Sequence, residues 1–133
     1  ESQTGVVWAL LNLGLAERAA GNLAQAARHY RRCFQLNLQL ERAGGMMAAL
    51  EGLASIAAAE GHAKRAVTLL SAAQALRTRS GQVLSLYEVD IQQQSITTAK
   101  AALSAAEWHT AWSKGAALSP QQVAALVSET GSS

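Results

Sequence analysis

The chain has 133 residues, of which 50% are hydrophobic and only 15% are charged, and its formal net charge is +2. This composition excludes an intrinsically disordered chain, and the net charge is too small for the dense basic stripe of a dedicated nucleic-acid-binding domain. Alanine occurs 29 times and leucine 18 times, whereas proline occurs once. Since alanine and leucine are strong helix formers and almost nothing interrupts the backbone, the composition predicts an all-α domain.

Glycines and a few polar turn residues divide the first part of the chain into helices. Gly21 suits the left-handed position that ends a helix, and Asn22 suits the N-cap of the next helix. A second break is expected at residues 43–45, where an alanine precedes two glycines. The helices predicted on this basis span residues 5–20, 23–41, 46–60 and 62–79.

The remainder of the chain predicts a C-terminal extension of three helices. The fifth helix is the least defined, because Asp90 could lie inside a long helix or cap a shorter one that begins at Ile91. Ser119 precedes a proline and has a glutamine three residues later, which is the pattern of a capped helix start. The helices expected here span residues 83–103, 105–114 and 119–128.

An internal repeat relates the first two helices to the next two. When the chain is shifted so that Gly5 falls on Gly45, small and apolar residues of the first helical pair coincide with identical residues of the second. The further matches include Ala9 on Ala49, Leu10 on Leu50, Leu13 on Leu53, Gly21 on Gly61 and Ala26 on Ala66. We interpret the repeat as two antiparallel helix pairs, which must stack to bury their apolar faces.

Each unit carries two leucines three residues apart, then a small residue, a turn glycine, an alanine and a large residue. These positions are Leu10, Leu13, Gly14, Gly21, Ala26 and Tyr30 in the first unit, and Leu50, Leu53, Ala54, Gly61, Ala66 and Leu70 in the second. The pattern resembles the tetratricopeptide (TPR) repeat, although the period from Gly5 to Gly45 is longer than the usual one of about 34 residues. The resemblance implies a TPR-like superhelical array with a C-terminal helical cap. Its parts would be a helix pair over 1–41, a second pair over 44–80 and an extension over 83–128, in one domain of residues 1–133.

The run of residues 48–77 and the C-terminal segment with Leu103, Trp108, Trp112 and Gly115 resemble the C-terminal TPR-like region of bacterial LuxR-type (MalT-like) ATPase transcriptional regulators. The resemblance implies a non-catalytic regulatory module that acts through contacts with a protein or with another domain of its parent. It also implies that the chain is a fragment of a longer regulator, and we expect the first helix, with Trp8, to present an apolar face.

Candidate catalytic and metal sites are weak. His29 and Cys33 lie one helical turn apart but have no third ligand, and Glu107 and His109 point apart on a helix. The arginines at 28, 31 and 32 are expected on a solvated face, not on a nucleic acid. Trp108 and Trp112 are expected to anchor the sixth helix on the fifth. We therefore expect no enzymatic activity, no cofactor and no bound metal.

The concave side of the stacked pairs is the best candidate for binding, because it is lined by the first helix of each pair. The residues expected to face a partner there are Trp8, Leu11, Asn12, Leu15, Arg18, Glu51 and Ser55. Two alternatives remain: self-association through the first helix as a homodimer, and a small-molecule sensor with a pocket between the array and the C-terminal helices. No apolar run is long enough to span a bilayer, no signal peptide is visible and the single cysteine suits a reducing compartment, so we expect a cytoplasmic location without membrane contact.

Overall fold

The computed structural model describes residues 3–81 and 86–128, and within these ranges the chain consists of helices joined by short turns. The predicted all-α class is confirmed. No helix in the described part of the chain combines the length and the apolar character needed to cross a membrane. The helices are α1 (Gln3–Ala19), α2 (Leu23–Gln39), α3 (Ala43–Ala59), α4 (Ala63–Ser80), α5 (Leu86–Ala102), α6 (Ala105–Ala116) and α7 (Pro120–Ser128).

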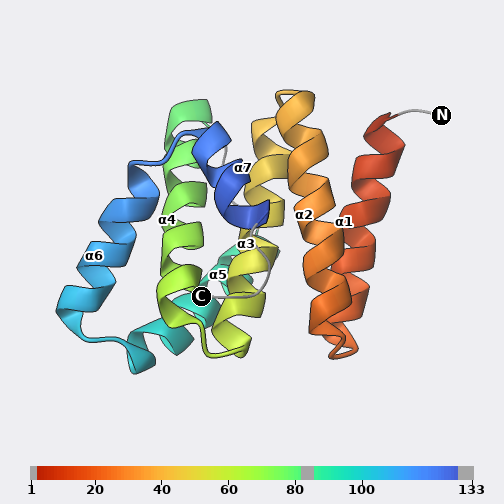
Figure 1. Cartoon of the computed structure of the whole chain (residues 1–133). Coiled ribbons are helices and arrows are strands. Elements are labelled where there is room, and N and C mark those ends of the chain that lie inside the picture. Colours follow the sequence, from red (N-terminus) through yellow and green to blue (C-terminus); the bar gives the residue numbers. More distant parts are fainter. Residues whose placement is uncertain (1–2, 82–85, 129–133) are drawn as a thin grey trace.

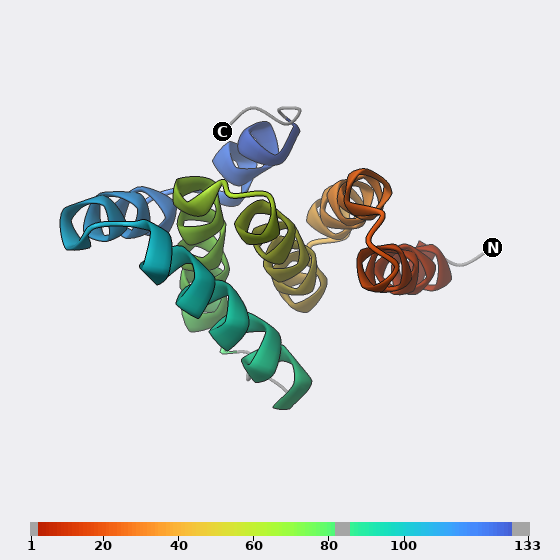
Figure 2. The ribbon, with the colours of Figure 1, turned by 90° about the horizontal axis from the view of Figure 1, so that it is seen from below.

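The first four helices stand side by side in chain order, each antiparallel to the one before it (Figure 1). α6 packs along α4 and thus continues the row. α5 crosses the row against α3 and α4 on one face, whereas α7 lies on the opposite face and contacts α2 (Figure 2). This arrangement leaves α1 at one end of the row.

The turns between the first four helices follow one design. At each turn the chain makes the paired hydrogen bonds of a Schellman motif, for example from the amide of Asn22 to the carbonyl of Glu17 (2.8 Å) and from that of Gly21 to Arg18 (3.0 Å). Each turn has one residue in the left-handed conformation. These residues are, in chain order, Gly21 (φ +86°), Glu41 (φ +56°) and Gly61 (φ +84°). The α2 and α4 helices consequently begin at equivalent positions of the repeat, Leu23 and Ala63, and α1 and α3 also begin at equivalent positions, Gln3 and Ala43.

The break predicted at residues 43–45 is wrong, because α3 begins at Ala43 and its first turn contains Gly44 and Gly45. The turn lies earlier, at Glu41. Gly45 serves close packing instead, since a Cβ atom there would lie 1.9 Å from Oδ1 of the buried Asn37 on α2.

The helix starts show which capping signals the chain uses. Asn22 occupies the N-cap position of α2, but its side chain caps nothing and donates instead to Oε1 of Glu17 (2.8 Å). Ser119 makes the predicted reciprocal bonds with Gln122 (2.8 and 3.1 Å). A second capping box joins Ser104 and Glu107, and its hydrogen bonds hold the pKa of the Glu107 carboxyl below the ordinary value. Asp90 lies inside α5, so the alternative start at Ile91 is wrong, whereas residues 83–85 of the predicted helix lie outside the described residues.

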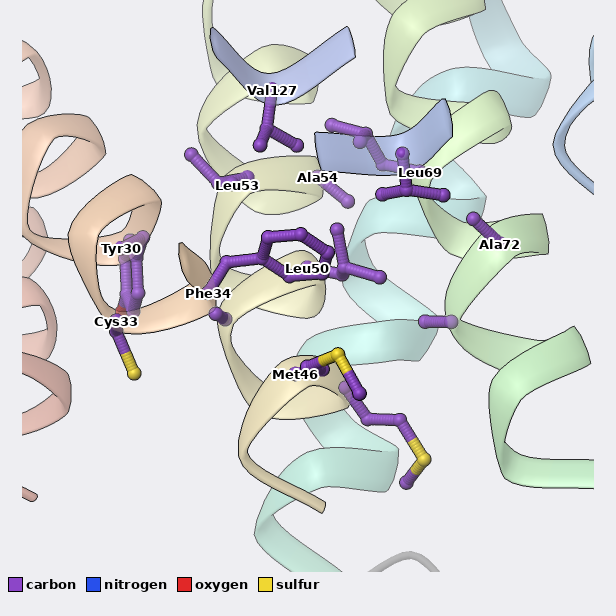
Figure 3. Packing of buried hydrophobic residues seen from close by; sticks show 14 of the residues in the cluster. Tyr30, Cys33, Phe34, Met46, Leu50, Leu53, Ala54, Leu69, Ala72 and Val127 are labelled. Carbon is purple, nitrogen blue, oxygen red and sulfur yellow. The ribbon is translucent and has the colours of Figure 1, made fainter. Parts of the chain in front are cut away.

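The main hydrophobic core lies between α2, α3, α4 and α7. Figure 3 shows Phe34 reaching from α2 toward Leu50 of α3, with Leu69 of α4 and Val127 of α7 closing the cluster. All four side chains are essentially inaccessible to solvent. The core therefore holds the middle of the row, and α1 joins it through one face only.

The tryptophans of α6 have the predicted packing role but a different main partner. Trp108 and Trp112 stack with ring centroids 5.7 Å apart and pack against Ala63 and Val67 of α4 as well as Ala99 of α5. Gly115 allows α6 to approach α4 closely. Any side chain there would collide with α4, because a Cβ atom on Gly115 would lie 2.2 Å from the carbonyl oxygen of Thr68. The predicted anchoring of the sixth helix on the fifth is thus corrected to anchoring mainly on the fourth.

Candidate functional site

A groove of about 830 Å³ opens on the face of the row that also carries α5. Its walls come from α1 and from Ile91 of α5, and its floor comes from α2 and α3. In Figure 2, α1 and α5 flank α3 on the same side of the molecule.

Five of the seven residues expected to face a partner line this groove: Trp8, Leu11, Asn12, Leu15 and Glu51. Arg18 and Ser55 do not belong to its lining. Ser55 lies further along α3, where its hydroxyl donates to the carbonyl of Gly52 (2.8 Å). The groove is thus displaced toward the start of α1 and α3 relative to the sequence prediction.

The α1 wall is apolar because of the way in which α1 packs. Val7, Leu10 and Gly14 are buried, and the helical period then turns Trp8, Leu11 and Leu15 toward the groove. Trp8 is 62% exposed, which is unusual for so large an apolar side chain.

The floor contains Tyr30, which the sequence marks only as the large residue of the first repeat unit. Its ring lies between two helices that carry glycine at the point of contact: a Cβ on Gly14 would lie 2.8 Å from the ring, and a Cβ on Gly52 would lie 2.5 Å from it. The absence of side chains at these two positions lets the tyrosine ring, which is 1% exposed, fit between α1 and α3. The glycines at positions 14 and 52, which leave room for a large side chain between α1 and α3, were the signal in the sequence that could have revealed this floor.

Glu51 was predicted as a polar contact on an open face, but it is only 4% exposed. Its Oε2 accepts a hydrogen bond of 2.7 Å from Nη2 of Arg77 on α4, and Arg77 is itself buried and bonded to Gln74. Removing a charge from such a buried pair leaves the other uncompensated. Glu51 therefore contributes to the groove mainly as a fixed structural element.

Cys33 also lines the groove, beneath α1. Its thiol lies 3.8 Å from the carbonyl oxygen of Val7, and Nδ2 of Asn37 contacts the sulfur at 3.4 Å. Burial raises the pKa of this thiol from 9.0 to about 11, which keeps it protonated and unreactive at neutral pH. Among the described residues, no group of three His, Cys, Asp or Glu side chains is placed to hold a metal ion.

Charged side chains stand at one end of the groove. Glu41 and Arg42 belong to the turn before α3, both are exposed, and both belong to the lining. Gly44 and Gly45, in the first turn of α3, follow them along the floor. The groove thus combines an apolar wall, an aromatic floor and one polar end.

A second, smaller cavity of about 400 Å³ lies between α4 and α6. Its lining combines polar residues such as Lys64, Thr68 and Lys114 with Ala106 and Ala111, and does not include the stacked tryptophans.

The chain matches no protein-family model, and comparison with curated proteins and with solved structures gives no match either.

Proposed function

We propose that the chain is a non-catalytic binding module that holds a segment of a partner protein in the groove between α1, α3 and α5. The observation that carries the proposal is the apolar wall of α1, where Trp8 is 62% exposed beside a groove of about 830 Å³. An exposed tryptophan next to a concave surface is a frequent anchor in protein interfaces.

The volume of the groove is large enough for a short helix as the occupant. A cylinder of ~10 Å diameter and two helical turns occupies roughly 850 Å³, which is close to the volume of the groove. An amphipathic helix would place its apolar side chains against Trp8, Leu11 and Leu15, in the mode by which grooves generally bind such helices. Its polar residues would meet Glu41 and Arg42 at the end of the groove.

The resemblance to LuxR-type regulators extends the proposal to a biological role. In that role the chain is the regulatory module of a bacterial ATP-dependent transcriptional regulator, and the bound segment belongs to a partner or to another domain of the same regulator. Binding would shift an equilibrium between inactive and active states only if the segment has different affinities for the two.

The test uses a phage-displayed library of 18-residue amphipathic helices, followed by titration of the selected peptides into ¹⁵N-labelled protein. We expect micromolar binders that shift the amide signals of Gly44 and Gly45 in the floor of the groove. Leu15→Glu should weaken these peptides at least tenfold, because it places a carboxylate in the apolar wall. Ala24→Glu makes a similar change at an exposed position of α2 and should leave the affinity unchanged.

The proposal fails if the library yields no binder, or if the selected peptides bind Leu15→Glu and the parent chain equally well.

A further inference from the structure

The side of α2 that points away from α1 and α3 carries three arginines. α2 buries Tyr30 and Asn37 against its neighbours, and the helical period then turns Arg28 and Arg32 to solvent, one helical turn apart. Arg31 lies beside them and is half-buried. We call these three arginines the basic strip of α2, and it lies on the side of the row where α7 is found (Figure 2).

Nothing in the described part of the chain neutralises the basic strip. None of its arginines forms an ion pair with a described residue, and neither α2 nor α7 contains an acidic residue. The neighbouring helices α1 and α3 contain one carboxylate each, and both are engaged elsewhere: Glu17 with Asn22 and Glu51 with Arg77.

The charge of the strip exceeds that of the whole protein. The strip carries three positive charges, whereas the chain has a formal net charge of +2, so the rest of the sequence is slightly acidic. The arginines therefore form a local excess of positive charge and are not one part of a generally basic surface. A local excess of this kind attracts a partner of opposite charge and suits recognition of a limited segment.

Carboxylates limit the strip at both ends of α2. Glu17 stands at the start, where it accepts a hydrogen bond from Asn22, and the exposed Glu41 stands in the turn that follows the last residue of the helix. A long polyanion, such as a nucleic-acid duplex or an anionic membrane surface, would extend past the arginines and meet these carboxylates. A short acidic segment would contact the arginines alone, so the charge pattern favours a short segment.

From this pattern we infer that the basic strip of α2 binds a short acidic helix of a partner protein, with carboxylates four residues apart. Arg28 and Arg32 are ~6 Å apart along the helix axis at 1.5 Å per residue, and carboxylates at the same spacing on a partner helix match them. A guanidinium group binds a carboxylate through two parallel hydrogen bonds, which makes arginine better suited to this contact than lysine. Gln25 and Gln35, both exposed, offer uncharged hydrogen-bonding groups beside the arginines.

The inference does not depend on the proposed groove function. Tyr30, Cys33 and Asn37 are the residues of α2 that line the groove, and none of the three arginines belongs to its lining. The two surfaces lie on opposite sides of α2, so each can be disrupted without the other.

The test titrates two synthetic helical peptides into the whole chain labelled with ¹⁵N. The acidic peptide carries four glutamates as two i, i+4 pairs on one face, between uncharged ends, and the control peptide has glutamines at those positions. We expect the acidic peptide to shift the amide signals of Arg28 and Arg32, and the control peptide to leave them in place. The affinity should fall about tenfold between roughly 50 and 300 mM salt, because exposed ion pairs are screened.

Variants locate the contact. Arg28→Gln combined with Arg32→Gln should weaken the acidic peptide at least tenfold, whereas Arg79→Gln, which removes an exposed arginine from α4, should leave the affinity unchanged. Leu15→Glu in the groove should also leave it unchanged. Reversing the strip with Arg28→Glu and Arg32→Glu should create binding to a peptide with lysines in place of the glutamates. Unchanged helix content in circular dichroism would verify that the variants fold.

The inference is overturned if the acidic peptide does not bind at millimolar concentration in low salt, or if it binds the Arg28→Gln, Arg32→Gln variant as tightly as the parent chain. Tighter binding of the strip to a short DNA duplex or to phosphatidylserine vesicles than to the acidic peptide would also overturn it.

Discussion

The α1 and α3 helices share a length of 17 residues and the same register within the repeat, yet eleven residues of α3 are buried and only three of α1. The buried face of α1 corresponds to the face of α3 that packs on α4, with Leu10 and Leu50 at equivalent positions. The second face of α3 packs on α2, and its equivalent on α1 is exposed. The difference shows that position in the row, and not helix sequence alone, decides which apolar residues form the core.

The two helix pairs also differ in how they fill equivalent positions. The positions of Glu51 and Arg77 in the second pair correspond to Leu11 and Asn37 in the first. The second pair therefore contains a buried ion pair at a place where the first pair exposes an apolar side chain to the groove.

The largest expected effect comes from breaking that ion pair. Arg77→Ala should lower the free energy of unfolding by about 3–5 kcal/mol, because it removes the cation that compensates the buried Glu51 carboxylate. Urea unfolding followed by circular dichroism measures the change. The double variant Glu51→Leu with Arg77→Met should recover most of the loss, and a double variant as unstable as Arg77→Ala would contradict this explanation.

The next largest effect is expected where the Tyr30 ring lies between Gly14 of α1 and Gly52 of α3. Gly52→Ala should lower the free energy of unfolding by about 1–3 kcal/mol, because the new methyl group would lie 2.5 Å from the Tyr30 ring. Gly14→Ala should cost less, since α1 stands at the end of the row and has room to move. Equal losses for the two variants would show that α1 is held as firmly as α3.

Gly5→Ala is the matched control for these glycine variants. No atom lies within 4 Å of the added methyl group, so the free energy of unfolding should rise by about 0.5–1 kcal/mol through helix propensity alone.

A smaller effect of favourable sign is expected at the turn between the pairs. Glu41 adopts a left-handed conformation that glycine adopts without strain, and the equivalent turns inside the pairs use Gly21 and Gly61. Glu41→Gly should therefore raise the free energy of unfolding by about 1 kcal/mol, which thermal unfolding would register as a higher midpoint. Gly61→Ala should lower it by a similar amount, and a stabilising Gly61→Ala would contradict the assignment of strain to this conformation.

The smallest effect concerns local opening of the first pair. Cys33 lies under α1 and its equivalent in the second pair is Ala73, so alkylation of the one thiol reports on the first pair alone. We expect slow alkylation by iodoacetamide of the folded chain at neutral pH, with a rate that keeps rising with pH toward the pKa of about 11. Reaction at urea concentrations below the global midpoint would show that α1 opens before the core.

The same raised pKa has a consequence for stability. The folded-state pKa of about 11 exceeds the ordinary value of 9.0, so the fold favours the protonated thiol. This contribution is fully present below pH 9 and is lost as the pH rises through 11. Cys33→Ala should remove the part of the stability loss at alkaline pH that comes from ionisation of this thiol.

The amino-acid sequence alone determined the helical class, most helix boundaries and the turns at Gly21 and Gly61. These features follow from local physics: helix propensity, the spacing of apolar residues and the left-handed conformations that glycine permits. The four groove residues of α1, Trp8, Leu11, Asn12 and Leu15, were also predictable, because the register of α1 decides which side chains share a face.

Tertiary structure decided what local patterns leave open. Gly45 resembles a turn residue in the sequence, but Asn37 of the neighbouring helix makes it a packing residue inside α3. Glu51 resembles a surface carboxylate until Arg77, 26 residues away in sequence, is placed beside it. Likewise, Leu13 and Leu53 are identical in the repeat and differ in burial because only α3 has a neighbouring helix on both sides. Burial depends on which helices lie alongside, and no local sequence pattern contains that information.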